Sequence, residues 1–158
     1  MDSNGQTQLF IASRDNQVGL VEELILAGAD VNQAKAGDGL RPLIIAAHHG
    51  HVEVVDLLLD GNADVNQAAA DGVTPLITAA HYGHVEVVYD LLGVNAEVNQ
   101  AMSSSGATPL FAAANHGHVE VMRLLLGGGA DINQAATGGS TPLITWKRWT
   151  SCWVEMQT

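Results

Sequence analysis

The chain has 158 residues, 47% of them hydrophobic but only 4% aromatic, so it can form one compact unit or a short stacked array rather than two ordinary domains. Seventeen acidic residues against six basic ones give a net charge of −11, which argues against nucleic acid and anionic membranes as partners. No apolar run approaches about 18 residues, the N-terminus carries no export signal, and Cys152 is the single cysteine. We therefore predict a soluble, cytoplasmic protein without an internal disulfide.

Pro-Leu pairs recur along the chain at a nearly constant distance. The prolines Pro42, Pro75, Pro109 and Pro142 follow one another at spacings of 33, 34 and 33 residues. A fixed period of this size indicates a stack of repeated units. We predict a single domain, residues 1–158, with repeats at 5–37, 38–70, 71–104 and 105–137, a partial fifth repeat at 138–145 and an atypical tail at 146–158.

The first helix of each unit is predicted to begin at the Thr-Pro pair. The threonine hydroxyl caps free N–H groups, and proline at the first helical position needs no hydrogen-bond acceptor. Thr74, Thr108 and Thr141 occupy the capping position, and Thr7 does so in a degenerate first copy. Arg41 replaces the threonine in the second copy, which should weaken that helix start by about 1 kcal/mol.

Glycine or asparagine is predicted to end both helices of each unit in the left-handed conformation. The first helix should end at Asn16, Gly50, Gly83 and Gly117 in the successive copies. The second helix carries valine and leucine at helical spacing and should end at Gly28, Asn62, Asn95 and Gly129. The remaining residues carry turn signals and predict extended loops or β-hairpins. Because so small a helix pair cannot bury its apolar face alone, we predict an all-α solenoid of stacked helix-turn-helix units.

The Thr-Pro-Leu, Gly-His-x-Glu-Val-Val, Leu-Leu and Gly-Ala-Asp-Val-Asn elements, at a period of 33 residues, resemble the ankyrin repeat from residue 5 to about residue 145. Two kinds of departure stand out. Histidine is usual in the family after Pro-Leu, but this chain has Ile44, Ile77, Phe111 and Ile144, so the hydrogen bonds of that histidine must be absent or made otherwise. Glu23 and Asp90 replace Leu57 and Leu124 of the other copies, and we interpret them as solvent-facing repeat edges or local soft spots.

The resemblance implies a non-catalytic module for protein–protein interaction, an adaptor or scaffold without a cofactor, whose partner lies in a concave groove of loop tips and first helices. The groove candidates on the first helices are Arg14, Asp15, His48, His49, His81, Tyr82, Asn115 and His116. The loop tips would add Lys35, Asp38, Leu40, Asp71, Val73, Met102, Ser103, Ser105, Thr137 and Ser140. Tolerated variation at a solvent-facing surface is the alternative interpretation. Clustered histidine would make groove contacts sensitive to pH between 5.5 and 7.5.

Seven histidines also raise the possibility of a metal-binding or enzymatic protein. Stacked helices lie roughly 8–10 Å apart, whereas Zn–N bonds of about 2 Å need ligands that nearly touch. His51, His84 and His118 belong to the repeated Gly-His element and are expected to orient the second helix. No nucleophile elbow, dinucleotide fingerprint or phosphate-binding lysine motif is present in the sequence. We predict no catalytic residue and no metal site.

The tail after Ile144 abandons the repeat pattern and contains all three tryptophans. A reading frame shifted by two bases is compatible with Glu-Thr-Val-Asp-Lys-Leu-Leu-Gly-Gly-Asn-Ala-Asp, which matches residues 120–131 in pattern. One hypothesis is therefore a longer array truncated by a frame change, a fragment without an independent partner. The alternative is a true cap, since Trp146, Trp149, Trp153 and Met156 follow helical spacing. We predict a monomer, with self-association through the tail as an alternative.

Overall fold

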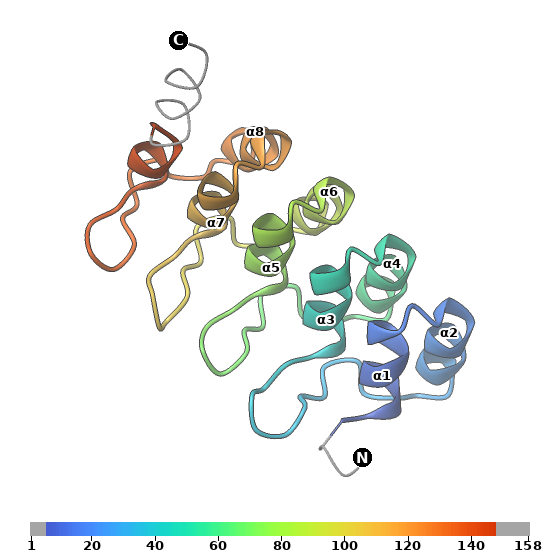
Figure 1. Cartoon of the computed structure of the whole chain (residues 1–158). Helices are drawn as coiled ribbons and strands as arrows, with labels where there is room; N and C mark the ends of the chain where they lie inside the picture. Colours follow the sequence, from blue (N-terminus) through green and yellow to red (C-terminus); the bar gives the residue numbers. More distant parts are fainter. Residues whose placement is uncertain (1–5, 148–158) are drawn as a thin grey trace.

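The computed structural model describes residues 6–147, and it forms a solenoid of paired short helices (Figure 1). The odd-numbered helices make one row, the even-numbered helices a second row behind it, and the connecting loops project to one side. No strand occurs within residues 6–147, so the loops are extended connections rather than β-hairpins, and the predicted all-α solenoid is confirmed. The helices are α1 (Gln8–Arg14), α2 (Val18–Leu26), α3 (Pro42–His49), α4 (Val52–Asp60), α5 (Pro75–Tyr82), α6 (Val85–Gly93), α7 (Pro109–His116) and α8 (Val119–Gly127), followed by helical backbone at residues 142–147.

The helix starts follow the predicted capping chemistry. The hydroxyls of Thr7, Thr74 and Thr108 accept hydrogen bonds from the backbone N–H three residues further on, at 3.1, 3.2 and 3.2 Å. Arg41 makes no such cap, as expected from its side chain. Its guanidinium instead donates to the carbonyls of Gly39 and Ala68, at 2.9 and 2.7 Å, and so ties two successive loops together.

The helix ends also agree with the sequence pattern. Gly50, Gly83 and Gly117 end the first helices at φ values of 71°, 78° and 74°. Asparagine takes the same left-handed conformation at Asn16 in the first copy. The second helices are followed by left-handed residues at Gly28, Asn62, Asn95 and Gly129. Glycine and asparagine therefore exchange at these sites because both tolerate a positive φ.

The core lies between the two rows of helices. Ala46, Ala79 and Ala113 are fully buried on the first helices, and their small side chains let neighbouring first helices approach closely. Valine and leucine fill the opposite side, including Val21, Val55, Val88, Leu58, Leu91 and Leu125. Ile44 and Ile77 are also buried, so apolar packing replaces the hydrogen bonds of the family's usual histidine at those positions. Ile144 differs and is 51% exposed.

Asparagine side chains join each repeat to the next one. Asn32 donates to the carbonyl of Asn62 at 3.2 Å and accepts from the N–H of Asp64 at 2.7 Å. Asn66 and Asn99 repeat this pair of bonds one and two units further along. The predictions about Trp149, Trp153 and Met156, and about a shifted frame or a cap, lie outside the described residues apart from Trp146 and Lys147.

Candidate functional site

Aromatic rings form a continuous row across the C-terminal ends of α3, α5 and α7. Within a repeat, the ring centroids of His48 and His49 are 4.7 Å apart, and those of His81 and Tyr82 are 4.6 Å apart. Between repeats, His48 contacts Tyr82 at 4.3 Å and His81 contacts His116 at 4.0 Å. These five rings, here called the ring row, are thus linked through three successive repeats.

A second set of histidines forms hydrogen bonds to the backbone near the ring row. The Nε2 atoms of His51, His84 and His118 lie 3.1, 3.0 and 2.9 Å from backbone carbonyls near the end of the first helix of the preceding repeat. A carbonyl oxygen only accepts, so Nε2 carries the proton in each ring. Each of these histidines begins a second helix and ties it to the preceding repeat, which extends the orienting role predicted from the sequence.

The positions of these hydrogen-bonded histidine rings explain why Gly50 and Gly83 are glycines. A Cβ atom built on Gly50 would lie 2.6 Å from Nδ1 of His84, and one built on Gly83 would lie 2.6 Å from Nδ1 of His118. Real Cβ contacts do not come so close, and both residues also have a positive φ. Glycine is therefore required here for space as well as for conformation.

An apolar hollow of about 250 Å³ lies beside the ring row, here called the front hollow. Ile44, Ile45 and Ile77 line it from the first helices, and the loop residues Leu40, Val73 and Met102 line it from the side. His48, His81 and Tyr82 also line it. The loop residues were predicted from the sequence as groove candidates, whereas Ile45, Ile77 and Thr78 were not, because their pattern is that of ordinary core positions.

His48, His49 and His81 of the ring row have pKa values below the ordinary value of histidine. Burial lowers the pKa of His48, and the neighbouring His84 lowers it further. Burial is also the first cause of the lowered pKa values of His49 and His81, followed by His48 for the former and by His116 and His118 for the latter. These three rings are therefore uncharged at neutral pH and present imidazole nitrogens rather than positive charges.

The remaining groove candidates lie at the two ends of the row. Arg14 pairs with Asp15, with Nε and Oδ1 2.7 Å apart, and this hydrogen bond lowers the pKa of the exposed Asp15. Protonation of His49 would lower the pKa of Asp15 further, because the ion pair adjoins this first ring of the row. At the other end, Asn115 is exposed beside His116 on α7. The structure thus joins five of the eight candidates through ring contacts, with the ion pair beside them.

Comparison with known families decides the identity of the repeats. A model of ankyrin repeats in three copies matches residues 9–102, and a model of the single ankyrin repeat matches residues 105–137. The chain belongs to the ankyrin repeat family. No curated protein matches the sequence. Ankyrin repeats are generally protein–protein interaction modules and are typically not enzymes, which supports the predicted class of function.

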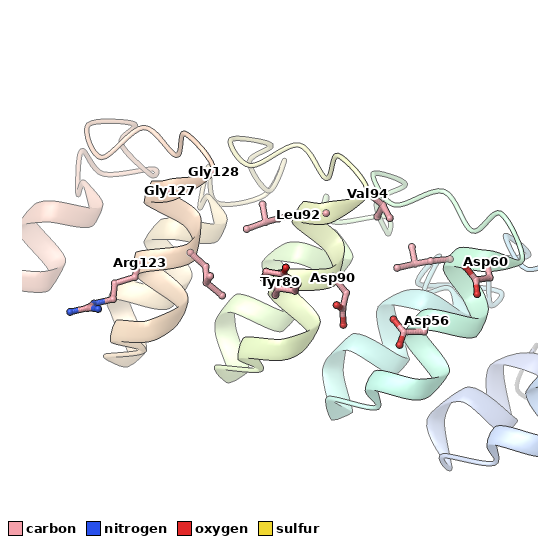
Figure 2. A pocket seen from close by; sticks show the side chains of 12 residues that line it. Asp56, Asp60, Tyr89, Asp90, Leu92, Val94, Arg123, Gly127 and Gly128 are labelled. Atoms are coloured by element: carbon pink, nitrogen blue, oxygen red, sulfur yellow. The ribbon is translucent and has the colours of Figure 1, made fainter.

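The opposite face of the ankyrin stack has a hollow of its own, of about 740 Å³, between α4, α6 and α8 (Figure 2). Asp90 lies in its wall, half-buried, at the repeat position that holds Leu57 and Leu124 in neighbouring copies. Glu23, at the same position in the first copy, is exposed, which confirms the solvent-facing interpretation for that residue. For Asp90 the interpretation was incomplete, because the departure from leucine was visible in the sequence but the groove around it was not.

Two further properties bear on this ankyrin domain. None of the helices in residues 6–147 has the length and apolar character that crossing a membrane requires. Over the same described stretch, no group of three or more His, Cys, Asp or Glu side chains is arranged to hold a metal ion.

Proposed function

We propose that this ankyrin domain binds a protein partner through the ring row and the front hollow. The observation that carries the proposal is the continuity of the five rings across three repeats beside an apolar hollow. Tyr82 is 46% exposed at its centre, and His49 and His116 are exposed towards its ends. Exposed aromatic side chains beside an apolar pocket are the usual material of the energetically dominant contacts in an interface.

The chemistry of the front hollow specifies what the partner presents. A volume of about 250 Å³ is smaller than the pockets that hold drug-sized ligands, so it suits a single inserted apolar side chain. The uncharged imidazoles of His48 and His81 provide hydrogen-bonding groups around the opening. We expect a partner segment with one apolar anchor and neighbouring polar groups. The domain would act in the cytoplasm as an adaptor or scaffold without catalysis of its own.

Two tyrosines of one repeat give a matched test. Tyr82 lies in the ring row, whereas Tyr89 is on α6, lines the hollow on the opposite face and is 67% exposed. Proteins retained from lysate by the immobilised chain are compared with those retained by Tyr82→Ala and Tyr89→Ala, and a retained protein is then purified and titrated. Loss of an interface anchor costs about 2 kcal/mol or more, so Tyr82→Ala should weaken its binding by at least about tenfold.

The control defines what contradicts the proposal. For a partner bound at the ring row and the front hollow, Tyr89→Ala should leave the affinity unchanged. Equal affinity of Tyr82→Ala and the wild-type chain, or a loss caused by Tyr89→Ala alone, would refute the front site. Retention of no protein by the wild-type chain would favour the alternative of a truncated fragment without an independent partner.

A further inference from the structure

The hollow on the second-helix side, here called the back groove, surrounds Asp90, which replaces the leucine of the neighbouring copies. Leu57 and Leu124 occupy the equivalent position in the neighbouring copies, and both are partly buried and packed against the core. Asp90 places a polar, charged side chain at that position. The α4–α6 contact is the sparsest among the pairs of neighbouring second helices. The groove of about 740 Å³ opens at this place and extends to α8.

Most of the groove wall is apolar. Leu59, Leu92 and Leu124 contribute one side chain each from α4, α6 and α8. Tyr89 and Val94 line the same groove and are 67% and 43% exposed. Large exposed apolar side chains gathered around a groove mark a surface suited to contact with another molecule.

Three of the four charged residues that line the groove are acidic. Asp56 and Asp60 on α4 and Asp90 on α6 line it, and in Figure 2 the carboxylates of Asp56 and Asp90 lie at the gap between the two helices. Within residues 6–147 none of the three has a hydrogen-bond donor or a cation beside its carboxylate. Burial, followed by the charges of Asp56 and Glu86, raises the pKa of Asp90. A cation placed here would offset the repulsion between the carboxylates of Asp90, Asp56 and Glu86.

The one basic residue of the lining does not supply that cation. Arg123 is on α8, and its guanidinium points away from the groove on the far side of the helix (Figure 2). The ion pairs of the described part of the chain, Arg14–Asp15 and Lys35–Asp38, lie at the first-helix ends and in a loop. The carboxylates of the back groove are therefore available to a group from another molecule.

We propose that the back groove binds a basic segment of a protein partner, in which a lysine or arginine stands next to an apolar side chain. The aliphatic stem of the basic residue packs along Leu59 and Leu92, and its head reaches the carboxylates of Asp56 and Asp90. The exposed ring of Tyr89 adds a face for the cation. The net charge of −11 attracts such a segment from a distance. This surface is separate from the ring row and does not depend on it.

A peptide titration tests the proposal directly. The probe is a blocked peptide of alternating leucine and lysine, five residues long, added to the isotope-labelled full chain and followed by NMR. We expect chemical-shift changes on α4, α6 and α8. Asp90→Asn should weaken binding by about fivefold, in the range of a partly screened charge pair, and Asp90→Leu, which also fills the groove, by more.

Matched variants and peptides separate this site from general attraction. Glu120→Gln removes one negative charge from α8 outside the groove, and Tyr82→Ala removes a tyrosine from the other face; both should leave the affinity within about twofold of wild type. A peptide with glycine in place of leucine should bind more weakly, as should one with glutamate in place of lysine. Unfolding in urea checks that each variant folds.

Three outcomes would overturn the proposal. The glycine–lysine peptide could bind as well as the leucine–lysine peptide, which would leave charge alone as the cause. Glu120→Gln could weaken binding as much as Asp90→Asn, which would give the same conclusion. Finally, sedimentation could reveal self-association that Asp90→Leu abolishes, in which case the groove belongs to a second copy of this chain.

Discussion

The two faces of this solenoid follow from the same repeat but are packed differently. On the first-helix face, Ala46, Ala79 and Ala113 are fully buried, the helices lie close together, and rings of neighbouring repeats touch. On the second-helix face the neighbouring helices make fewer contacts, and the loosest pair encloses a groove beside Asp90. A repeated spacing thus fixes where helices stand, while single side chains decide whether the space between them is filled.

The faces also differ in the way they respond to protons. The front has three histidines whose pKa values burial lowers, so these rings are uncharged at neutral pH. The back has a half-buried carboxylate whose pKa burial raises. Both shifts mean that the charged form is the costly one in the folded chain. Acid therefore charges the front and neutralises Asp90, and each face can be disturbed separately.

The largest expected effect is a loss of stability when the hydrogen bond between His118 and the carbonyl of His81 is disturbed. Gly83→Ala forces a left-handed alanine and places its Cβ 2.6 Å from Nδ1 of His118, which must move from the carbonyl of His81. The conformational cost and the lost hydrogen bond together should lower the free energy of unfolding by roughly 2–3 kcal/mol. Urea unfolding followed by circular dichroism measures this change.

Gly117 supplies the control for that substitution. It has a similar φ of 74°, and no described atom lies within 4 Å of a Cβ built on it. Gly117→Ala should therefore cost only the conformational part, about 1 kcal/mol. Equal losses from the two substitutions would mean that the ring of His118 moves aside without cost and that the tie contributes little to stability.

A smaller change in the free energy of unfolding, of opposite sign, is expected for a substitution in the back groove. Asp90→Leu restores the side chain of the neighbouring copies and removes a half-buried charge, so it should raise the free energy of unfolding by about 1 kcal/mol. Glu23→Leu makes the same kind of change at the same repeat position where the side chain is exposed, and should change stability by less than about 0.5 kcal/mol. Urea midpoints of both variants test the difference. A similar gain from both would show that the groove does not set the cost of Asp90.

More of the first-helix face than of the second-helix face could be predicted from the sequence, and the reasons are physical. Thr74 and Gly83 determine a helix start and a helix end through local bonds and φ alone, so their roles follow from the residue type. The groove candidates His48 and Tyr82 could be placed on one face, but their 4.3 Å contact depends on how closely two repeats stack. Asp90 was visible as a departure from leucine, yet whether neighbours would close the gap depends on packing that no local pattern specifies.

The smallest expected effect is the response to mild acid, because the histidines are partly exposed and water screens their charges. The pKa values of His48, His49 and His81 lie below the ordinary 6.5 in the folded chain, so the unfolded chain binds more protons as the pH falls through 6.5. Stability contributed by the uncharged rings is complete above that pH and is lost below it. Asp90 acts in the opposite sense: its raised pKa favours the folded chain as its carboxyl is protonated, in a window that begins at the ordinary 3.8 and extends to its raised value.

Urea midpoints at pH 7.5 and 5.5 distinguish these contributions. The wild-type midpoint should be lower at pH 5.5, and the difference should shrink in a His48→Gln, His81→Gln double variant, because two of the rings that resist protonation are gone. Asp90→Leu should keep the wild-type difference, since the pH interval lies nearer the histidine window. If the double variant retained the full difference, other groups would be responsible for the acid response and the ring row would not be the pH-sensitive face.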